Sequence, residues 1–107
     1  MDSGKEIMDK LDELFSKQKN FQFHTGFNPE LKDICSALMS EGGELWATCG
    51  KWWKKRQSTR EKQVEETVDI LHFFLTLCLR LGITPQELYD AYCEKLKVNY
   101  QRQADGY

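Results

Sequence analysis

The sequence predicts an all-α domain with a four-helix, bundle-like architecture. Four stretches repeat apolar residues at the three- and four-residue spacing of a helix, and helix-start and helix-stop residues separate them. No stretch alternates apolar and polar residues as a half-buried strand does. Of the 107 residues, 40% are hydrophobic and 30% are charged, which is typical of a folded chain. We therefore expect residues 1–107 to form one domain.

The first two predicted helices are joined by an aromatic-rich connector. The first helix covers about residues 5–18, and the connector covers residues 21–27. Asn28 is the expected N-cap of the second helix, with Pro29 in its first turn. This helix is expected to end near Gly50, because glycine often follows the last helical turn.

The third and fourth predicted helices follow a basic loop at residues 51–60. The third helix, about residues 61–81, is apolar around much of its circumference, so we place it at the centre of the core. Thr84 and Glu87 form a capping box that opens the fourth helix, which runs to about Arg102. A chain this short cannot cover so apolar a helix, so we expect a homo-oligomer, either a homodimer or a homotetramer.

Charge and cysteine usage exclude some classes of protein. The net charge of −2 argues against a protein whose main partner is nucleic acid. No apolar run approaches the ~18 residues of a membrane span, and the N-terminus has no signal-peptide pattern. The four cysteines are widely spaced and form no CxxC pair, so we expect reduced thiols and a cytoplasmic location.

Two pairs of carboxylates carry the predicted chemistry. Glu41 and Glu44 lie three residues apart on the second predicted helix, and Glu66 and Asp69 have the same spacing on the third. Residues three apart share a helix face, so antiparallel packing would bring all four together. Burying like charges is costly unless a divalent cation offsets them, and oxygen ligands favour Mg²⁺, with Mn²⁺ as an alternative. The other interpretation is two solvated acidic faces.

Neighbouring residues add to this prediction. Gly42 and Gly43 are adjacent inside the second predicted helix, where each glycine costs roughly 1 kcal/mol relative to alanine. Their presence indicates a close approach by a ligand or by a neighbouring backbone. Glu65 shares a face with Asp69 and could supplement or replace a ligand.

The pattern resembles that of the all-α nucleoside triphosphate pyrophosphohydrolases, the MazG and dimeric dUTPase superfamily. The resemblance rests on ExxE at 41–44 and ExxD at 66–69, and it extends through Asp69-Ile-Leu-His72-Phe73-Phe74 to the C-terminal Lys, Asn and Arg residues. It implies that Glu41, Glu44, Glu66 and Asp69 hold magnesium ions that bridge the substrate phosphates. It also implies that water attacks the α-phosphorus and releases pyrophosphate, and we assign Glu44 as the general base.

The resemblance also implies substrate contacts. On the fourth helix Lys95, Asn99 and Arg102 form one stripe that could face the triphosphate and sugar, although a solvated stripe is the more common outcome. Lys54 is the expected phosphate contact after the first carboxylate helix. Trp53 is expected either to line the base pocket or to pack at a loop. Gln18 is a candidate for the base contact, and Phe21 or Phe23 could stack on the base.

Three functions remain open from the sequence. The first is a pyrophosphohydrolase of a pyrimidine deoxynucleotide, either dUTP or dCTP. The second is a non-catalytic helical interaction module whose acidic helices face solvent. The third is a di-iron carboxylate protein, but only one weak carboxylate-xx-His pair, Asp69 with His72, is present. We favour the first and expect His72 to be a core or pocket residue.

Overall fold

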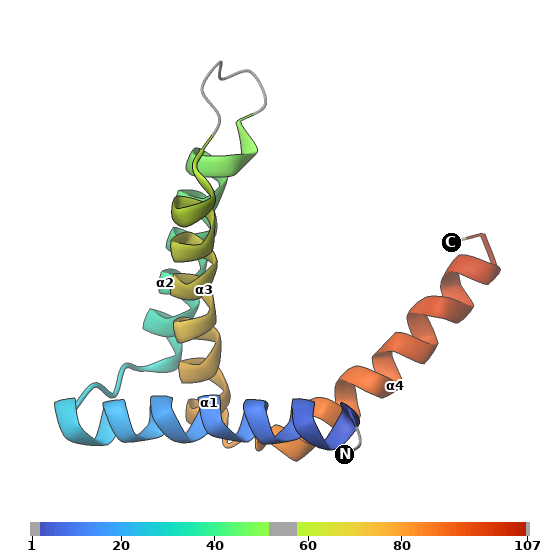
Figure 1. Cartoon of the computed structure of the whole chain (residues 1–107), viewed down its shortest axis with the longest axis horizontal. Coiled ribbons are helices and arrows are strands. Elements are labelled where there is room, and N and C mark those ends of the chain that lie inside the picture. Colours follow the sequence, from blue (N-terminus) through green and yellow to red (C-terminus); the bar gives the residue numbers. More distant parts are fainter. Residues whose placement is uncertain (1–2, 52–57, 107) are drawn as a thin grey trace.

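The computed structural model describes residues 3–51 and 58–106, and these residues are almost entirely helical. Four α-helices lie in the described residues: α1 (Ser3–Thr25), α2 (Leu31–Leu45), α3 (Arg60–Leu81) and α4 (Pro85–Ala104). No strand occurs among them. The predicted all-α class is therefore confirmed. Figure 1 shows α2 and α3 as an upright pair, α1 lying across the lower end of α3, and α4 leaving to one side.

The first helix is longer than the sequence analysis predicted. The expected aromatic connector continues α1 as far as Thr25. Aromatic residues lower helix propensity only slightly, so packing can extend the helix through them. The helix ends at Gly26, whose φ of 74° lies in the left-handed region and whose N–H donates to the carbonyl of Gln22 at 2.9 Å.

The prediction that Asn28 is the N-cap of the second helix was wrong. Glu30, in an extended conformation, is the residue that precedes α2, and its carbonyl accepts the N–H groups of Asp33 and Ile34. Asn28 lies outside the helix and instead accepts a hydrogen bond from Arg80 at 3.5 Å. At the other end, α2 passes into one π-helical turn, η1 (Trp46–Gly50). The predicted end near Gly50 is therefore confirmed.

Threonine side chains cap the starts of α3 and α4, and a glycine ends α3. Thr59 caps α3 by accepting from the N–H of Lys62 at 3.1 Å. Thr84 caps α4 in the same way, accepting from the N–H of Glu87 at 3.1 Å, as predicted. Gly82, with φ of 71°, ends α3. A turn of two residues then leads into α4.

The core lies where α1 crosses α3. Phe15 of α1 packs with Leu75 and Cys78 of α3, and all three are buried. The helices α2 and α3 pack side by side along their length, whereas α4 packs against α1 and against no other described helix. The chain therefore forms an open arrangement rather than a closed four-helix bundle. No single described helix has the length and hydropathy to cross a membrane, and α3 with α4 passes that test only as a pair bent by 106°.

Candidate metal and nucleotide site

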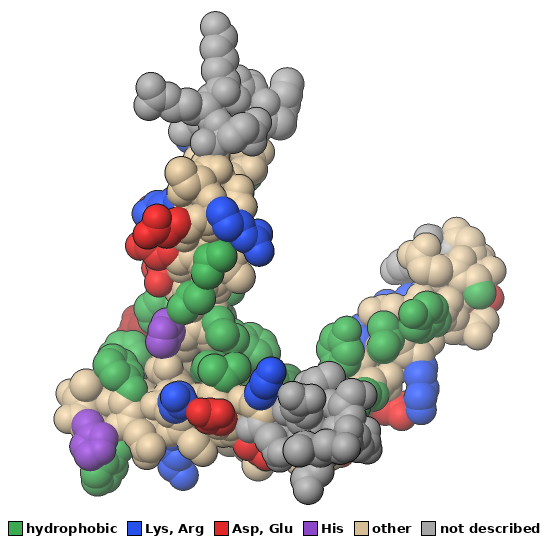
Figure 2. Space-filling model, viewed as in Figure 1, with side chains coloured by type: hydrophobic (Ala, Val, Ile, Leu, Met, Phe, Trp, Pro, Cys, Tyr) green, Lys and Arg blue, Asp and Glu red, His purple; other side chains and the backbone are tan. Residues whose placement is uncertain are grey.

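Three of the predicted carboxylates converge between α2 and α3. Glu41, Glu66 and Asp69 each offer an oxygen, and these oxygens lie within 4.8 Å of one another. Glu66 is only 5% exposed, and the other two are half-buried. We call these three residues the acidic cluster. Figure 2 shows acidic side chains gathered on the upright part of the molecule formed by α2 and α3.

The pKa of Glu41 is raised in the acidic cluster. Burial is the main cause, because it disfavours the charged carboxylate. The negative charges of Asp69, Glu66 and Glu44 act in the same direction. Burial and these neighbouring charges both disfavour the ionised form of Glu41, and a bound cation would favour it.

The donor set fits a divalent cation. A carboxylate cluster supplies only oxygen ligands, which Mg²⁺ and Mn²⁺ prefer over the nitrogen and sulfur ligands typical of zinc. Glu66 is a buried acid, and an uncompensated charge at a buried position is costly. The acidic cluster is therefore suited to holding a cation, and Glu41, Glu66 and Asp69 are the residues that would hold it.

A lysine already compensates part of this charge. Lys62 Nζ lies 3.3 Å from Glu66 Oε1 and 3.6 Å from Glu65 Oε2. The hydrogen bond to Glu66 is the main reason that the pKa of Lys62 is raised. No role for Lys62 was predicted from the sequence. Its position four residues before Glu66 is the sequence feature that indicates this ion pair.

A cavity of about 460 Å³ opens beside the acidic cluster. Glu41 and Asp69 form its acidic side, and Phe21, Phe27 and Phe73 supply apolar walls. Its remaining lining residues are Gln18, His72 and Thr76. A cavity with apolar walls and a few convergent polar groups is the usual form of a small-molecule site.

A chain of hydrogen bonds fixes the polar groups of this cavity. The hydroxyl of Thr76 donates to the backbone carbonyl of His72 at 2.8 Å, so its oxygen is left as an acceptor. Gln18 Nε2 donates to that oxygen at 3.2 Å. The amide oxygen of Gln18 therefore faces His72 Nδ1, at 3.0 Å. Both Gln18 and Thr76 are buried.

This network selects one tautomer of His72. Because the amide oxygen of Gln18 can only accept, Nδ1 of His72 must carry the proton. In a neutral imidazole the other nitrogen, Nε2, is then an acceptor. The reversed amide would require the Thr76 hydroxyl to give up its hydrogen bond to the His72 carbonyl and to donate to Gln18 instead. His72 thus presents a fixed acceptor beside the cavity, which makes it a pocket histidine as expected.

The structure does not bring Glu44 or the predicted α4 residues into the acidic cluster. Glu44 is exposed and outside the group of three, although it is close enough to raise the pKa of Glu41. The stripe on α4 consists of exposed residues, and α4 contacts neither α2 nor α3 within the described ranges. That stripe comprises Lys95, Asn99 and Arg102. Lys54 and Trp53 lie outside the described residues. The assignment of all these side chains stays a prediction.

The glycines of α2 border open space. A Cβ atom added to Gly42 or Gly43 would meet nothing within 4 Å. Among the described residues no neighbouring backbone approaches them, so of the two expected alternatives only close approach by a ligand remains. Room for a ligand remains next to the helix turn that carries Glu41.

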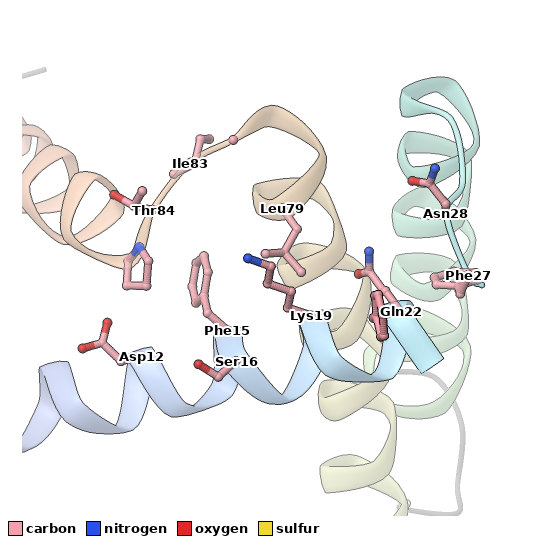
Figure 3. Close-up of a pocket in the computed structure, with 13 residues that line it drawn as sticks. Asp12, Phe15, Ser16, Lys19, Gln22, Phe27, Asn28, Leu79, Ile83 and Thr84 are labelled. Carbon is pink, nitrogen blue, oxygen red and sulfur yellow. The ribbon is translucent and has the colours of Figure 1, made fainter. Parts of the chain in front are cut away.

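A second, larger cavity of about 760 Å³ lies on α1, the end of α3 and the start of α4 (Figure 3). Phe15, Leu79 and Ile83 line it with apolar side chains, and Asp12 and Lys19 add charge. None of the carboxylates of the acidic cluster lines it. It therefore lacks the carboxylates that would hold a cation, and the smaller cavity is the better candidate.

Comparisons with known proteins identify the family of the chain. A family model described as dUTPase matches residues 5–85. Two curated relatives, each named dCTP pyrophosphatase, come from Enterobacteria phages T4 and LZ5. Each is 31% identical over 93 residues, which cover 73% of this chain and 54% of the relative. The chain thus spans about half the length of these relatives. No solved structure matches it with significant similarity.

Proposed function

Because the chain belongs to the dUTPase family, we propose that it hydrolyses a pyrimidine deoxynucleoside triphosphate to the monophosphate and pyrophosphate. We further propose a divalent cation as cofactor, Mg²⁺ in the cell, with Mn²⁺ able to replace it. The observation that carries the proposal is the convergence of Glu41, Glu66 and Asp69 beside a cavity of the size of a small-molecule site. In the runner-up, a non-catalytic interaction module, the buried Glu66 would serve only its ion pair with Lys62.

The carboxylates of the site have two different proposed roles. The acidic cluster holds the cation, which when bound acidifies water and offsets charge on the phosphate oxygens. Glu44 is the proposed general base: it stands one helical turn from Glu41, is exposed, and lies outside the group of three. Water would add to the α-phosphorus, and Glu44 would accept a proton from that water. The bond between the α-phosphorus and the oxygen that bridges to the β-phosphate would break, and pyrophosphate would leave.

The base is proposed to enter the cavity between Phe21 and Phe73. Aromatic rings can stack on a pyrimidine, and Nε2 of His72 accepts a hydrogen bond from an N–H on the base. Both pyrimidines offer such a donor, the 4-amino group of cytosine or N3–H of uracil. We favour dCTP over dUTP, because both curated relatives are named for dCTP. Four free thiols support a reducing compartment, and we propose the cytoplasm.

A homo-oligomer is part of the proposal, and the surface of the chain supports it. The radius of gyration is 16.8 Å, whereas a compact chain of this length has about 13 Å. The accessible surface is 8548 Å², against roughly 6,200 Å² for a compact protein of 12.6 kDa. The excess is of the size that obligate dimers bury. Several apolar side chains on α3, Val64, Val68 and Leu81 among them, are exposed.

The test is a panel of deoxynucleoside and nucleoside triphosphates, assayed for pyrophosphate and monophosphate with and without Mg²⁺. We expect metal-dependent release of both products, with dCTP the best substrate and purine nucleotides poor ones. Release of inorganic phosphate instead of pyrophosphate would contradict attack at the α-phosphorus. No turnover by a folded protein with metal present would favour the interaction module.

A further inference from the structure

Lys62 stands in the first turn of α3, where a positively charged side chain does not stabilise the helix. It is the third residue of α3, where Thr59 caps its N–H. The first turn of a helix disfavours cations, because the helix dipole is positive there. At the same position of α4, after the cap Thr84, stands Glu87, and glutamate is the residue that completes a capping box.

The order of the ion pair is also unfavourable for the helix alone. Lys62 precedes Glu66 by four residues, and this order stabilises helices less than the reverse. The pair nevertheless joins a half-exposed lysine to a carboxylate whose side chain is only 7% exposed. Exposed surface pairs contribute little, whereas a buried carboxylate needs compensation. The lysine is thus placed to serve the acidic cluster rather than the helix.

We propose that Lys62 is an internal counter-cation of the metal site. It stabilises the metal-free acidic cluster through Glu66, and it lowers the affinity of the cluster for a free divalent cation. The inference rests on the proposed metal site but needs no assumption about the nucleotide. Its physical basis is that a positive charge beside one ligand repels a second positive charge at the same cluster. The cluster therefore stays intact without a cation and binds one weakly unless substrate oxygens add ligands.

The experiment compares Lys62→Met with Lys62→Arg in the full chain. Mn²⁺ binding is measured by titration calorimetry without nucleotide, and thermal melting is measured in the absence of metal. Lys62→Met should bind Mn²⁺ more tightly by roughly 3- to 10-fold at low salt, since the repelling charge is gone. The same variant should melt at a lower temperature without metal. Lys62→Arg keeps the charge and should match the wild type within about 2-fold.

Lys97→Met is the matched control, because Lys97 pairs with Glu94 at 3.0 Å and both side chains are 74% exposed. It should change neither Mn²⁺ affinity nor melting. Should Lys62→Met fail to fold, as judged by circular dichroism, Lys62→Gln is expected to show the same tightening. Unchanged or weaker Mn²⁺ binding in the folded variant would overturn the proposal, as would a wild type that binds no Mn²⁺. A protein that binds Mn²⁺ as expected but hydrolyses no nucleotide would leave it standing and overturn only the proposed activity.

Discussion

Gln18 shows how a correctly chosen residue can have a different task from the expected one. It was selected from the sequence as a base contact, and it does line the candidate cavity. Yet both protons of its amide nitrogen are engaged, by Thr76 at 3.2 Å and by Gln22 at 3.3 Å, while its oxygen accepts from His72. The structure therefore favours Gln18 as a positioning residue for His72. Such a network joins residues 54 and 58 positions apart, so sequence spacing alone does not reveal it.

Gln18→Leu should separate positioning from plain packing. Without the amide, His72 loses the acceptor that fixes its tautomer, and buried Thr76 loses a partner. We expect KM for the best nucleotide to rise by roughly 10-fold and the free energy of unfolding to fall by about 1–3 kcal/mol. Steady-state kinetics and urea denaturation measure the two effects. Gln86→Leu, at an exposed amide paired with Asp90, is the control. Lower stability with an unchanged KM would assign Gln18 a structural role only.

Replacing Glu41 should change activity and stability in opposite directions. Its pKa is raised above 4.5, so the folded state favours the protonated form. The stability gained from protonation is present at low pH and is lost as pH rises through the raised pKa. Ionised Glu41 therefore destabilises the metal-free protein at neutral pH. Glu41→Gln should abolish turnover while raising the metal-free melting temperature at pH 7.

The pH dependence of melting checks this sign. The gap between Glu41→Gln and the wild type should shrink as pH falls from neutral toward the raised pKa of Glu41, because the wild-type carboxyl then becomes protonated. Glu94→Gln, at an exposed carboxylate of α4, should give no such gain. A variant that melts below the wild type at pH 7 would mean that Glu41 stabilises the empty cluster. Retained turnover would remove Glu41 from the metal site.

The elements of this chain were predictable where side chains cap them and less so where packing extends them. Thr84 and Gly82 mark their helix ends in the sequence, and the structure confirms both. Thr59 was hidden inside a stretch read as a basic loop, although it caps α3 as Thr84 caps α4. At Asn28 the residue type suited a cap, but the helix begins only after Glu30.

The course of α1 illustrates the limit of local signals. Its predicted end near Gln18 came from a change in composition, not from a stop residue. Gln18 and Phe15 are buried against α3, so the helix continues through the contact and ends only at Gly26. Spacing did predict that Glu41, Glu66 and Asp69 would converge, because they sit on long helices that pack side by side, whereas Glu44 lies outside the group. That these residues form a metal site stays a prediction.

At the scale of the whole molecule, the position of α4 was not predictable from its sequence. The helix was expected to close a bundle and to bring Lys95 to the phosphates. Instead a short turn after Gly82 directs it away from α2 and α3, and it packs on α1. The angle of that turn depends on the few residues between two capped helix ends. If the α4 stripe acts on the substrate, a second chain must supply it, which agrees with the excess accessible surface.

Mixing two impaired variants tests whether the α4 of one chain contributes to the acidic cluster of another chain. Lys95→Ala alone should cut activity by roughly 10-fold or more, and Glu41→Gln alone should abolish it. Co-expressed, they should form mixed dimers in which one site joins an intact cluster to an intact α4. With equal amounts, about a quarter of wild-type activity should return, because half the dimers are mixed and each has one complete site. Glu41→Gln mixed with Asp69→Asn is the control, since both residues belong to the cluster of one chain and no exchange restores it. Activity no higher than the mean of the separate variants would place Lys95 in its own chain's site or outside the reaction.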